Sequence, residues 1–269
     1  MDQDQKKEFY KNTFNTVADG YDSPALRFFP ESAARLPGYL DLTGREHVLD
    51  VATGTGAGAL ALAAALPTGR VTGIDFSKNM LARAGRKIAE AGYTNVELHE
   101  MDMQKIAFAD HQFDAATCCF ALFFIDDMEK QLSHLAAKVK PEGKVLITSF
   151  FENSFSPLVD IFFDCLVRYG VEPPALTWKR VANRETCTAL FKKAGLRDIR
   201  VEQVEAGYRL NSPDEWWQLV WNAGFRGLVE QLGKDLPRFK DEHLGKIGRL
   251  ANGSGIRMEM GIIYSVGTV

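Results

Sequence analysis

The sequence of 269 residues lacks features that would indicate a membrane protein, a secreted protein or a nucleic-acid-binding protein. No apolar run approaches the ~18 residues that a helix needs to span a membrane. The first ten residues, MDQDQKKEFY, contain no apolar stretch of a secretion signal. The net charge is −3, so the chain has no surplus of the basic residues that usually form a nucleic-acid-binding face. These absences favour a cytoplasmic protein with neither a membrane span nor a nucleic-acid partner.

Cysteine is scarce, and its spacing does not indicate a metal site. Two of the four cysteines, Cys118 and Cys119, are adjacent and cannot form an ordinary disulfide, and no Cys-x-x-Cys pair occurs. The five histidines are scattered, so no bound metal is expected. Because a free cysteine packs like a small apolar residue, Cys118 and Cys119 are predicted to be buried core thiols rather than nucleophiles.

Strand-like and helix-like patterns alternate along the chain. Strands are predicted over residues 47–52, 70–75, 95–100, 113–119, 144–151, 196–206 and 257–269. Helices are predicted over residues 57–67, 78–92, 127–140, 184–195, 211–232 and 236–251. This order is typical of an α/β fold with a doubly wound, Rossmann-like, mostly parallel sheet of seven strands and helices on both faces. The ligand crevice of such a sheet lies at the carboxyl ends of its strands.

The connection before the last strand is far longer than a hairpin loop and predicts a helical insertion. Its first helix opens with Ser212, Pro213 and Glu215, the signature of a capping box. Trp217 and Trp221 are four residues apart and share a helix face, so they either pack the insertion onto the sheet or line a pocket for an apolar molecule. The predicted segments are 1–46 (helical, closing over the ligand), 47–206 (ligand-binding core), 207–256 (helical lid) and 257–269 (terminal strand).

A glycine-rich turn follows the first predicted strand, in VLDVATGTG (48–56). A dinucleotide-binding turn needs the spacing GxGxxG, and Gly58 breaks it. The acidic residue that binds a ribose is present, because Asp75 lies 19 residues after Gly56. The carboxylate of Asp50 would repel a pyrophosphate but attract an ammonium or sulfonium group. The turn is therefore expected to hold an adenosine without phosphates, and S-adenosylmethionine carries an adenosine together with both cationic groups.

Five motifs, in order and spacing, resemble the class I S-adenosylmethionine-dependent methyltransferases, nearest to the ubiquinone/menaquinone C-methyltransferase branch (methyltransferase type 11). The motifs are VLDVATGTG, VTGIDFSKNML, MDM at 101–103, FDAATCCFAL and KVKPEGKVLITSF. The segment FNTVADGYD (14–22) is also similar to a segment of that branch. The likeness covers residues 9–151 well and the remainder poorly. It implies a Rossmann-like core, S-adenosylmethionine as methyl donor and S-adenosylhomocysteine as product.

The resemblance also implies which residues bind the cofactor. Asp75 would accept hydrogen bonds from the ribose hydroxyls, and Asp102 would accept one from the adenine amino group. The Met103 amide would reach a ring nitrogen, and Tyr21 would close over the amino acid end. The candidate set is Tyr21, Asp50, Ala52, Thr53, Gly54, Thr55, Gly56, Asp75, Phe76, Met80, Asp102, Met103 and Cys119. Structural alternatives remain, because Met80 also suits the core, Asp75 a strand end and Asp102 an ordinary turn.

The expected reaction is direct in-line methyl transfer to a small molecule. The sulfonium is already an activated donor, so the protein mainly aligns the acceptor, and no side chain is singled out as catalytic. Phe123 and Phe124 stand where the quinone-methylating enzymes typically carry an Arg-Asn pair, which predicts an apolar or aromatic acceptor pocket. Residues 208–256 are expected to cover that pocket. A nicotinamide-dependent oxidoreductase and a non-catalytic protein that binds S-adenosylmethionine or S-adenosylhomocysteine are the alternatives.

Overall fold

A computed structural model describes residues 3–269, which divide into two compact units. Unit 1 comprises the described residues up to Arg27, Asn153–Leu176 and Glu205–Gly261. Unit 2 comprises Phe28–Glu152, Thr177–Val204 and Ile262–Val269. The division differs from the predicted segments in two places. The N-terminal segment is shared between the units, and Asn153–Leu176, predicted as part of the core, belongs to unit 1.

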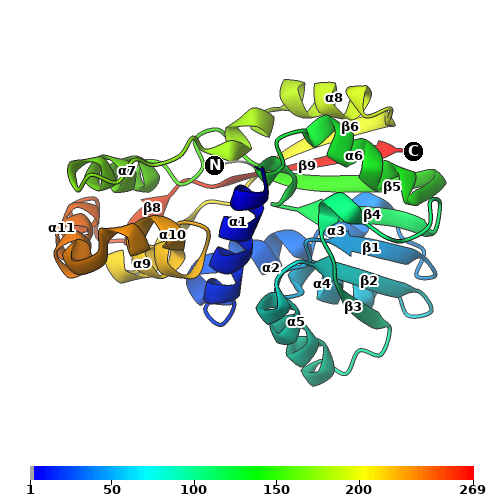
Figure 1. Cartoon of the computed structure of the whole chain (residues 1–269), viewed down its shortest axis with the longest axis horizontal. Coiled ribbons are helices and arrows are strands. Elements are labelled where there is room, and N and C mark those ends of the chain that lie inside the picture. Colours follow the sequence, from blue (N-terminus) through cyan, green and yellow to red (C-terminus); the bar gives the residue numbers. More distant parts are fainter. Residues whose placement is uncertain (1–2) are drawn as a thin grey trace. The chain divides into compact units, whose positions relative to one another are not determined.

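Unit 2 is built on a seven-stranded sheet in the order β3-β2-β1-β4-β5-β9-β6 (Figure 1). In that order the strands are β3 (Val96–Glu100), β2 (Arg70–Asp75), β1 (His47–Val51), β4 (Phe113–Cys119), β5 (Val139–Phe150), β9 (Gly261–Thr268) and β6 (Arg197–Glu205). The pairs from β3 to β5 are parallel, and β5 pairs with β9 in the antiparallel sense. The predicted Rossmann-like, mostly parallel sheet is confirmed.

Helices cover both faces of this sheet. They are α2 (Phe28–Ala33), α3 (Leu36–Leu40), α4 (Ala57–Ala65), α5 (Lys78–Glu90), α6 (Met128–Ala137) and α8 (Arg184–Lys193). Helices α2 and α3 pack against α4, and α6 packs against α8. Polar side chains begin three of them: Ser77 accepts from the Met80 amide at 3.2 Å, Asp127 from the Lys130 amide and Asn183 from the Thr186 amide. These caps satisfy amides that have no partner within the helix.

The register of the parallel strands brings their carboxyl ends together. Val51 at the end of β1 lies opposite Ile74 of β2 on one side and Cys118 of β4 on the other. Four of the five β1 residues are buried, as expected for a strand that helices cover on both sides. The segments that follow β1, β2 and β4 therefore emerge at one edge of the sheet.

Unit 1 is mainly helical. Its helices are α1 (Gln3–Val17), α7 (Leu158–Arg168), α9 (Pro213–Asn222), α10 (Arg226–Val229) and α11 (Leu236–Gly248), and β7 (Tyr208–Leu210) pairs with β8 (Ile256–Met258) in a small second sheet. Helix α11 packs against α7 and α9. None of the helices of residues 3–269 is long and apolar enough to cross a membrane.

Several predicted elements of unit 1 take a different form. Helix α7 was not predicted, although its buried residues Leu158, Phe162 and Cys165 recur at helical spacing. The predicted helix over 211–232 ends at Asn222, because Ala223 is extended, and the predicted terminal strand is divided between β8 and β9. Ser212 precedes α9 as expected, but its side chain makes no capping hydrogen bond.

The predicted capping box is therefore incomplete. The Glu215 carboxylate accepts a hydrogen bond from the Asn211 backbone amide at 3.1 Å, one residue before the position that a capping box requires. Glu215 still satisfies an amide at the start of α9, so the local sequence marks the beginning of this helix correctly.

A histidine lies in the core of unit 1. His243 on α11 is fully buried, and its Nε2 accepts a hydrogen bond from Trp216 Nε1 at 2.8 Å. The rings of Phe162 and Phe239 lie against it, and the buried Nδ1 has no hydrogen-bond partner. Burial lowers the pKa of His243 from 6.5 to about 4. The neutral imidazole is therefore the form that the folded unit accommodates.

We expect unit 1 to lose stability as the pH falls from 6.5 to 4, because His243 binds a proton more readily in the unfolded chain. At pH 4.5 this linkage costs about 2–3 kcal/mol relative to pH 7. Urea unfolding followed by tryptophan fluorescence measures the effect, since three of the four tryptophans lie in unit 1.

His243→Phe, which retains an aromatic ring, should flatten this pH dependence. The exposed His99 serves as the control, because His99→Gln should leave the pH dependence intact. A wild-type protein whose unit 1 is equally stable at pH 7 and pH 4.5 contradicts the prediction.

Candidate functional site

The turn after β1 has an open side and a packed side. Gly54 and Gly56 both have positive φ, and Gly56 begins α4. A Cβ at Gly54 would meet no atom within 4 Å, whereas one at Gly56 would lie 3.0 Å from Ala84 Cβ. A Cβ at Gly58 would lie 2.9 Å from an oxygen of Asp50. Gly54 therefore exposes backbone that a ligand can approach, while Gly56 and Gly58 let α4 pack closely.

Asp50 lies beneath this turn. It is 2% exposed, and its two oxygens accept hydrogen bonds from the hydroxyls of Thr53 and Thr117, each at 2.6 Å. Burial raises the pKa of Asp50, and the two hydroxyls oppose that change. The carboxylate thus connects β1 to the turn and to β4. Thr117 was not predicted, and strand pairing alone reveals it, because it lies opposite Asp50 in the register of β1 and β4.

Asp75, at the end of β2, contacts the same turn. Its two oxygens accept hydrogen bonds from the backbone amides of Gly54 at 2.9 Å and Ser77 at 2.8 Å. Burial, together with the nearby negative charge of Asp50, raises the pKa of Asp75 to about 6. The glycine turn and the acidic residue, which the sequence connected only by their spacing, are in direct contact.

The segment after β3 continues from Asp75. The Met101 amide donates to the Asp75 carbonyl at 2.9 Å, and Asp102 begins the 3-10 helix η2 (Met103–Lys105) by accepting from the Gln104 amide at 2.9 Å. Asp102 and Met103 are half-buried, and so is Phe76 after β2. Met80 is 1% exposed, as a core residue would be, and its contact with a ligand stays a prediction.

The two adjacent cysteines end β4. Burial raises the pKa of Cys118 to about 12 and also raises that of Cys119. Both thiols are therefore protonated at neutral pH and are poor nucleophiles. Cys119 pairs with Thr148 of β5 in the sheet register.

Aromatic rings gather directly after Cys119. Phe120 has a positive φ of 54° and stacks on Phe150 at the end of β5, with ring centroids 4.6 Å apart. Four further rings contact this pair or each other. We call the six rings the aromatic cluster, which consists of Phe28, Phe29, Phe120, Phe123, Phe150 and Trp178. Phe124 contacts the cluster through Phe123, and the centroids of these two rings are 4.9 Å apart. The sequence indicated only Phe123 and Phe124, because the other rings come from distant segments.

An arginine holds the predicted pocket segment in place. Arg180 donates to the backbone carbonyls of Phe123 at 2.9 Å and Asp126 at 3.0 Å. Phe123 is buried and Phe124 is half-buried. The backbone that carries these two rings is therefore anchored within unit 2.

Three predicted site residues belong to unit 1 and have partners there. The Tyr21 ring meets Phe14 edge to face, and Trp217 stacks on Trp221 with centroids 6.0 Å apart. The Arg226 guanidinium lies 3.3 Å from the centre of the Trp221 ring. Their predicted contacts with cofactor and acceptor stay predictions.

Comparisons with known proteins match this geometry to a family. A family model described as a methyltransferase domain matches residues 48–143. A demethylmenaquinone methyltransferase of Bacillus cytotoxicus is 35% identical over 149 residues, which are 54% of this chain and 63% of that protein. A second protein of that name, from Halalkalibacterium halodurans, is 31% identical over 180 residues, 60% of this chain and 72% of the relative. The chain is a class I S-adenosylmethionine-dependent methyltransferase by family.

Solved structures agree on the fold of this methyltransferase. The YcgJ protein of Bacillus subtilis aligns with a TM-score of 0.59 at 21% identity, over 88% of this chain and 98% of that one. A methyltransferase described as dependent on S-adenosylmethionine, from Aquifex aeolicus, aligns with a TM-score of 0.56 at 18% identity, over 94% and 97% of the two chains. The predicted family and cofactor are confirmed.

The site of the methyltransferase fits an S-adenosyl group. The open space beside Gly54 leaves room for the methionine part, and the Asp75 carboxylate is a charged acceptor suited to ribose hydroxyls. The carboxylates of Asp50 and Asp75 beside the turn disfavour a pyrophosphate. Among the described residues, no group of three or more His, Cys, Asp or Glu side chains is arranged to hold a metal ion.

We expect the affinity for S-adenosylhomocysteine to depend on the charge of Asp75. Asp75→Ala removes a charge-assisted acceptor and should cost about 1.5–3 kcal/mol, or roughly 10- to 150-fold in the dissociation constant. In the wild type, affinity should fall as the pH drops below the Asp75 pKa of about 6, since protonation removes the charge. Isothermal titration calorimetry between pH 5 and 8 measures both effects.

Asp198→Asn, at an exposed position of β6, is the matched control and should bind like the wild type. Unchanged affinity in Asp75→Ala overturns the ribose assignment.

Proposed function

We propose that this chain transfers a methyl group from S-adenosylmethionine to a small apolar or aromatic molecule. The observation that carries this proposal is the aromatic cluster, which begins at the residue after Cys119. The resemblance to related methyltransferases implies that Cys119 lies near the amino acid end of the cofactor, which is next to the reactive methyl group. Rings at that place favour a planar, apolar acceptor over a charged one. By their names, the relatives from Bacillus cytotoxicus and Halalkalibacterium halodurans act on a quinone.

The cofactor supplies a methyl group on a positively charged sulfur, which leaves as the neutral thioether of S-adenosylhomocysteine. An acceptor atom forms the new bond to the methyl carbon as the carbon–sulfur bond breaks, and a proton of the acceptor passes to solvent. No protein nucleophile is needed, which agrees with the protonated thiols of Cys118 and Cys119. The chain contributes orientation, and Arg180 helps by fixing the backbone of Phe123.

We extend the proposal to unit 1, whose residues 208–256 would act as a lid and whose Tyr21 would close over the cofactor. The connection between the neighbouring strands β6 and β9 carries three helices where a few residues would suffice. A lid that excludes water would favour methyl transfer to an apolar acceptor. Trp221 is the better candidate for acceptor contact, because it is half-buried whereas Trp217 is 5% exposed and packs against Phe239.

Likeness of fold does not by itself establish methyl transfer. A [4+2]-cyclase, SpnF, aligns with a TM-score of 0.58 at 18% identity, over 89% of this chain and 80% of that one. A non-catalytic protein that binds the cofactor is a further alternative. Family membership speaks against the nicotinamide-dependent oxidoreductase. Direct measurement of product formation separates these possibilities.

The test is transfer of a labelled methyl group to a panel of hydroquinones, phenols and charged amines, with NADH titrated in parallel. We expect labelled product and S-adenosylhomocysteine with ring compounds, and no binding of NADH. Phe124→Ala should raise the acceptor KM about tenfold and leave cofactor affinity unchanged, since one ring face is lost from the pocket wall. Trp221→Ala should act in the same direction if the lid contacts the acceptor.

Tyr93→Ala, which removes another half-buried ring, is the control and should leave the acceptor KM unchanged. Binding of S-adenosylmethionine without turnover of any acceptor would favour the non-catalytic alternative. Preference for charged amines would overturn the apolar pocket.

We expect turnover to need no metal, because the in-line reaction needs no Lewis acid and the described residues contain no cluster of ligands. Dialysis against a chelator, followed by an assay in chelator-treated buffer, should leave the rate unchanged. The wild type dialysed against buffer alone is the reference. A loss of activity that a single divalent ion restores refutes this expectation.

A further inference from the structure

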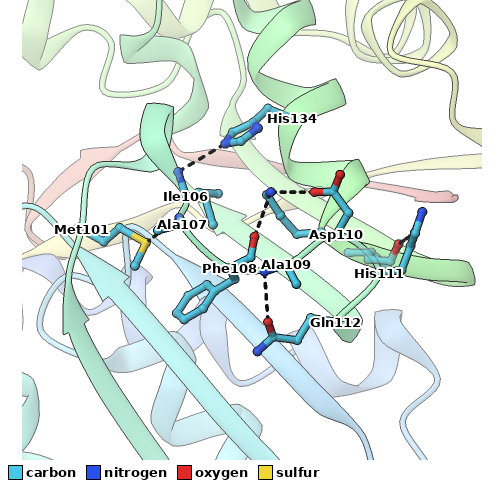
Figure 2. A network of polar contacts seen from close by, with 11 residues as sticks. Met101, Ile106, Ala107, Phe108, Ala109, Asp110, His111, Gln112 and His134 are labelled. Carbon is cyan, nitrogen blue, oxygen red and sulfur yellow. Dashed lines mark hydrogen bonds and ion pairs between the residues drawn. The ribbon is translucent and has the colours of Figure 1, made fainter.

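Three polar side chains, two on α6 and one at Lys138 directly after it, hold the segment that connects β3 to β4. Gln131 Nε2 donates to the Met103 carbonyl at 2.7 Å, His134 Nε2 accepts from the Ile106 amide at 3.3 Å, and Lys138 Nζ donates to the Phe108 carbonyl at 3.0 Å. Figure 2 shows His134 pointing toward the Ile106 amide. The three residues follow one another at spacings of three and four, so they share a helix face. We call them the α6 clamp.

The side chains of the α6 clamp need these hydrogen bonds because they are buried or pair with backbone. Gln131 is 5% exposed and Lys138 is 8% exposed, so both would bear a large cost without polar partners. Lys138 also forms an ion pair with Asp110 at 2.6 Å. His134 accepts through Nε2, which requires a neutral ring, and burial together with the charge of Lys138 lowers the pKa of His134. The clamp therefore fixes the backbone at three points between residues 103 and 108.

The first of these points controls a single peptide unit. The Met103 carbonyl and the Gln104 amide belong to the same peptide plane. Gln131 holds the carbonyl at 2.7 Å, and the amide donates to Asp102 Oδ1 at 2.9 Å. The orientation of the Asp102 carboxylate thus depends on a peptide whose other side is held by α6.

We infer that the α6 clamp positions the residues that recognise adenine. This inference rests on the proposed function, in which Asp102 accepts from the adenine amino group and the Met103 amide reaches a ring nitrogen. Gln131 is the principal positioning residue, because it acts on the peptide that orients Asp102. His134 and Lys138 hold the following residues, so that the segment cannot swing away from the end of β3.

The readout that isolates this role is selectivity for the base. Compared with S-adenosylhomocysteine, S-inosylhomocysteine carries an oxygen in place of the adenine amino group and a hydrogen on the adjacent ring nitrogen, so the ratio of the two affinities reports on both Asp102 and the Met103 amide. The wild type should prefer the adenosyl compound, and Asp102→Ala should lower the ratio. Gln131→Leu should weaken S-adenosylhomocysteine binding about tenfold and lower the ratio at least about threefold, because the Asp102 carboxylate loses its fixed orientation.

Substitutions of His134 provide a second test of the clamp and a variant that should restore base selectivity. His134→Leu cannot accept from the Ile106 amide and should lower the ratio, whereas His134→Gln offers a side-chain oxygen and should restore it. Gln112→Leu is the matched control, because Gln112 accepts from the Ala109 amide within the same segment but does not belong to α6. Figure 2 shows this bond at the far end of the segment. The control should keep the wild-type ratio.

Three outcomes overturn the inference. An unchanged ratio in Gln131→Leu and His134→Leu, with both affinities lowered equally, means that α6 supports only the stability of the unit. An unchanged ratio in Asp102→Ala overturns the adenine assignment and the clamp with it. Equal affinity of the wild type for the two compounds has the same consequence, although the proposed methyl transfer itself would stand.

Discussion

Two buried carboxylates around one turn determine how the rest of the site is arranged. Asp50 lies one residue before the end of β1 and Asp75 ends the adjacent strand β2, and between them they hold Thr53, Thr117 and the Gly54 amide. Burial raises the pKa of both, and the negative charge of Asp50 also raises the pKa of Asp75. An arrangement of this kind is costly without a cation. A ligand with an ammonium or a sulfonium group would relieve that cost, which is a physical reason for this turn to suit S-adenosylmethionine.

The proposed methyl transfer depends on two environments, the hydrogen-bonded glycine turn and the aromatic cluster at the ends of β4 and β5. Hydrogen bonds to Asp50 and Asp75 fix the turn, whereas the aromatic cluster consists of rings that are mostly buried. Direct displacement at a sulfonium gains from both, because the charged donor needs polar contacts and the acceptor needs an oriented, water-poor pocket. Arg180 and the α6 clamp each anchor the backbone of a segment that carries predicted site residues, at Phe123 and Met103 respectively.

The cores of unit 1 and unit 2 differ in the side chains that fill them. Parallel strands bury near-continuous apolar runs in unit 2, whereas unit 1 packs helices around aromatic rings and a neutral histidine. Trp216 Nε1 donates a hydrogen bond to His243 Nε2, whereas the buried Nδ1 of His243 has no hydrogen-bond partner. A core of this kind loses stability as the pH falls, because the unfolded chain binds a proton at His243 more readily.

Sequence by itself determined the Rossmann-like sheet, the family, the cofactor and the pairing of the glycine turn with Asp75. These features are local: strand periodicity, a turn that needs glycine, and a carboxylate one strand later all lie within about 30 residues. Only the tertiary structure decided which distant residues complete the site. Thr117 meets Asp50 through strand register, Phe28 and Phe150 join Phe120 from separate segments, and Gln131 reaches Met103 from a helix. Helix α7 also joined the insertion rather than the core. Such contacts depend on how elements pack, and the spacing of residues along a chain carries no record of that packing.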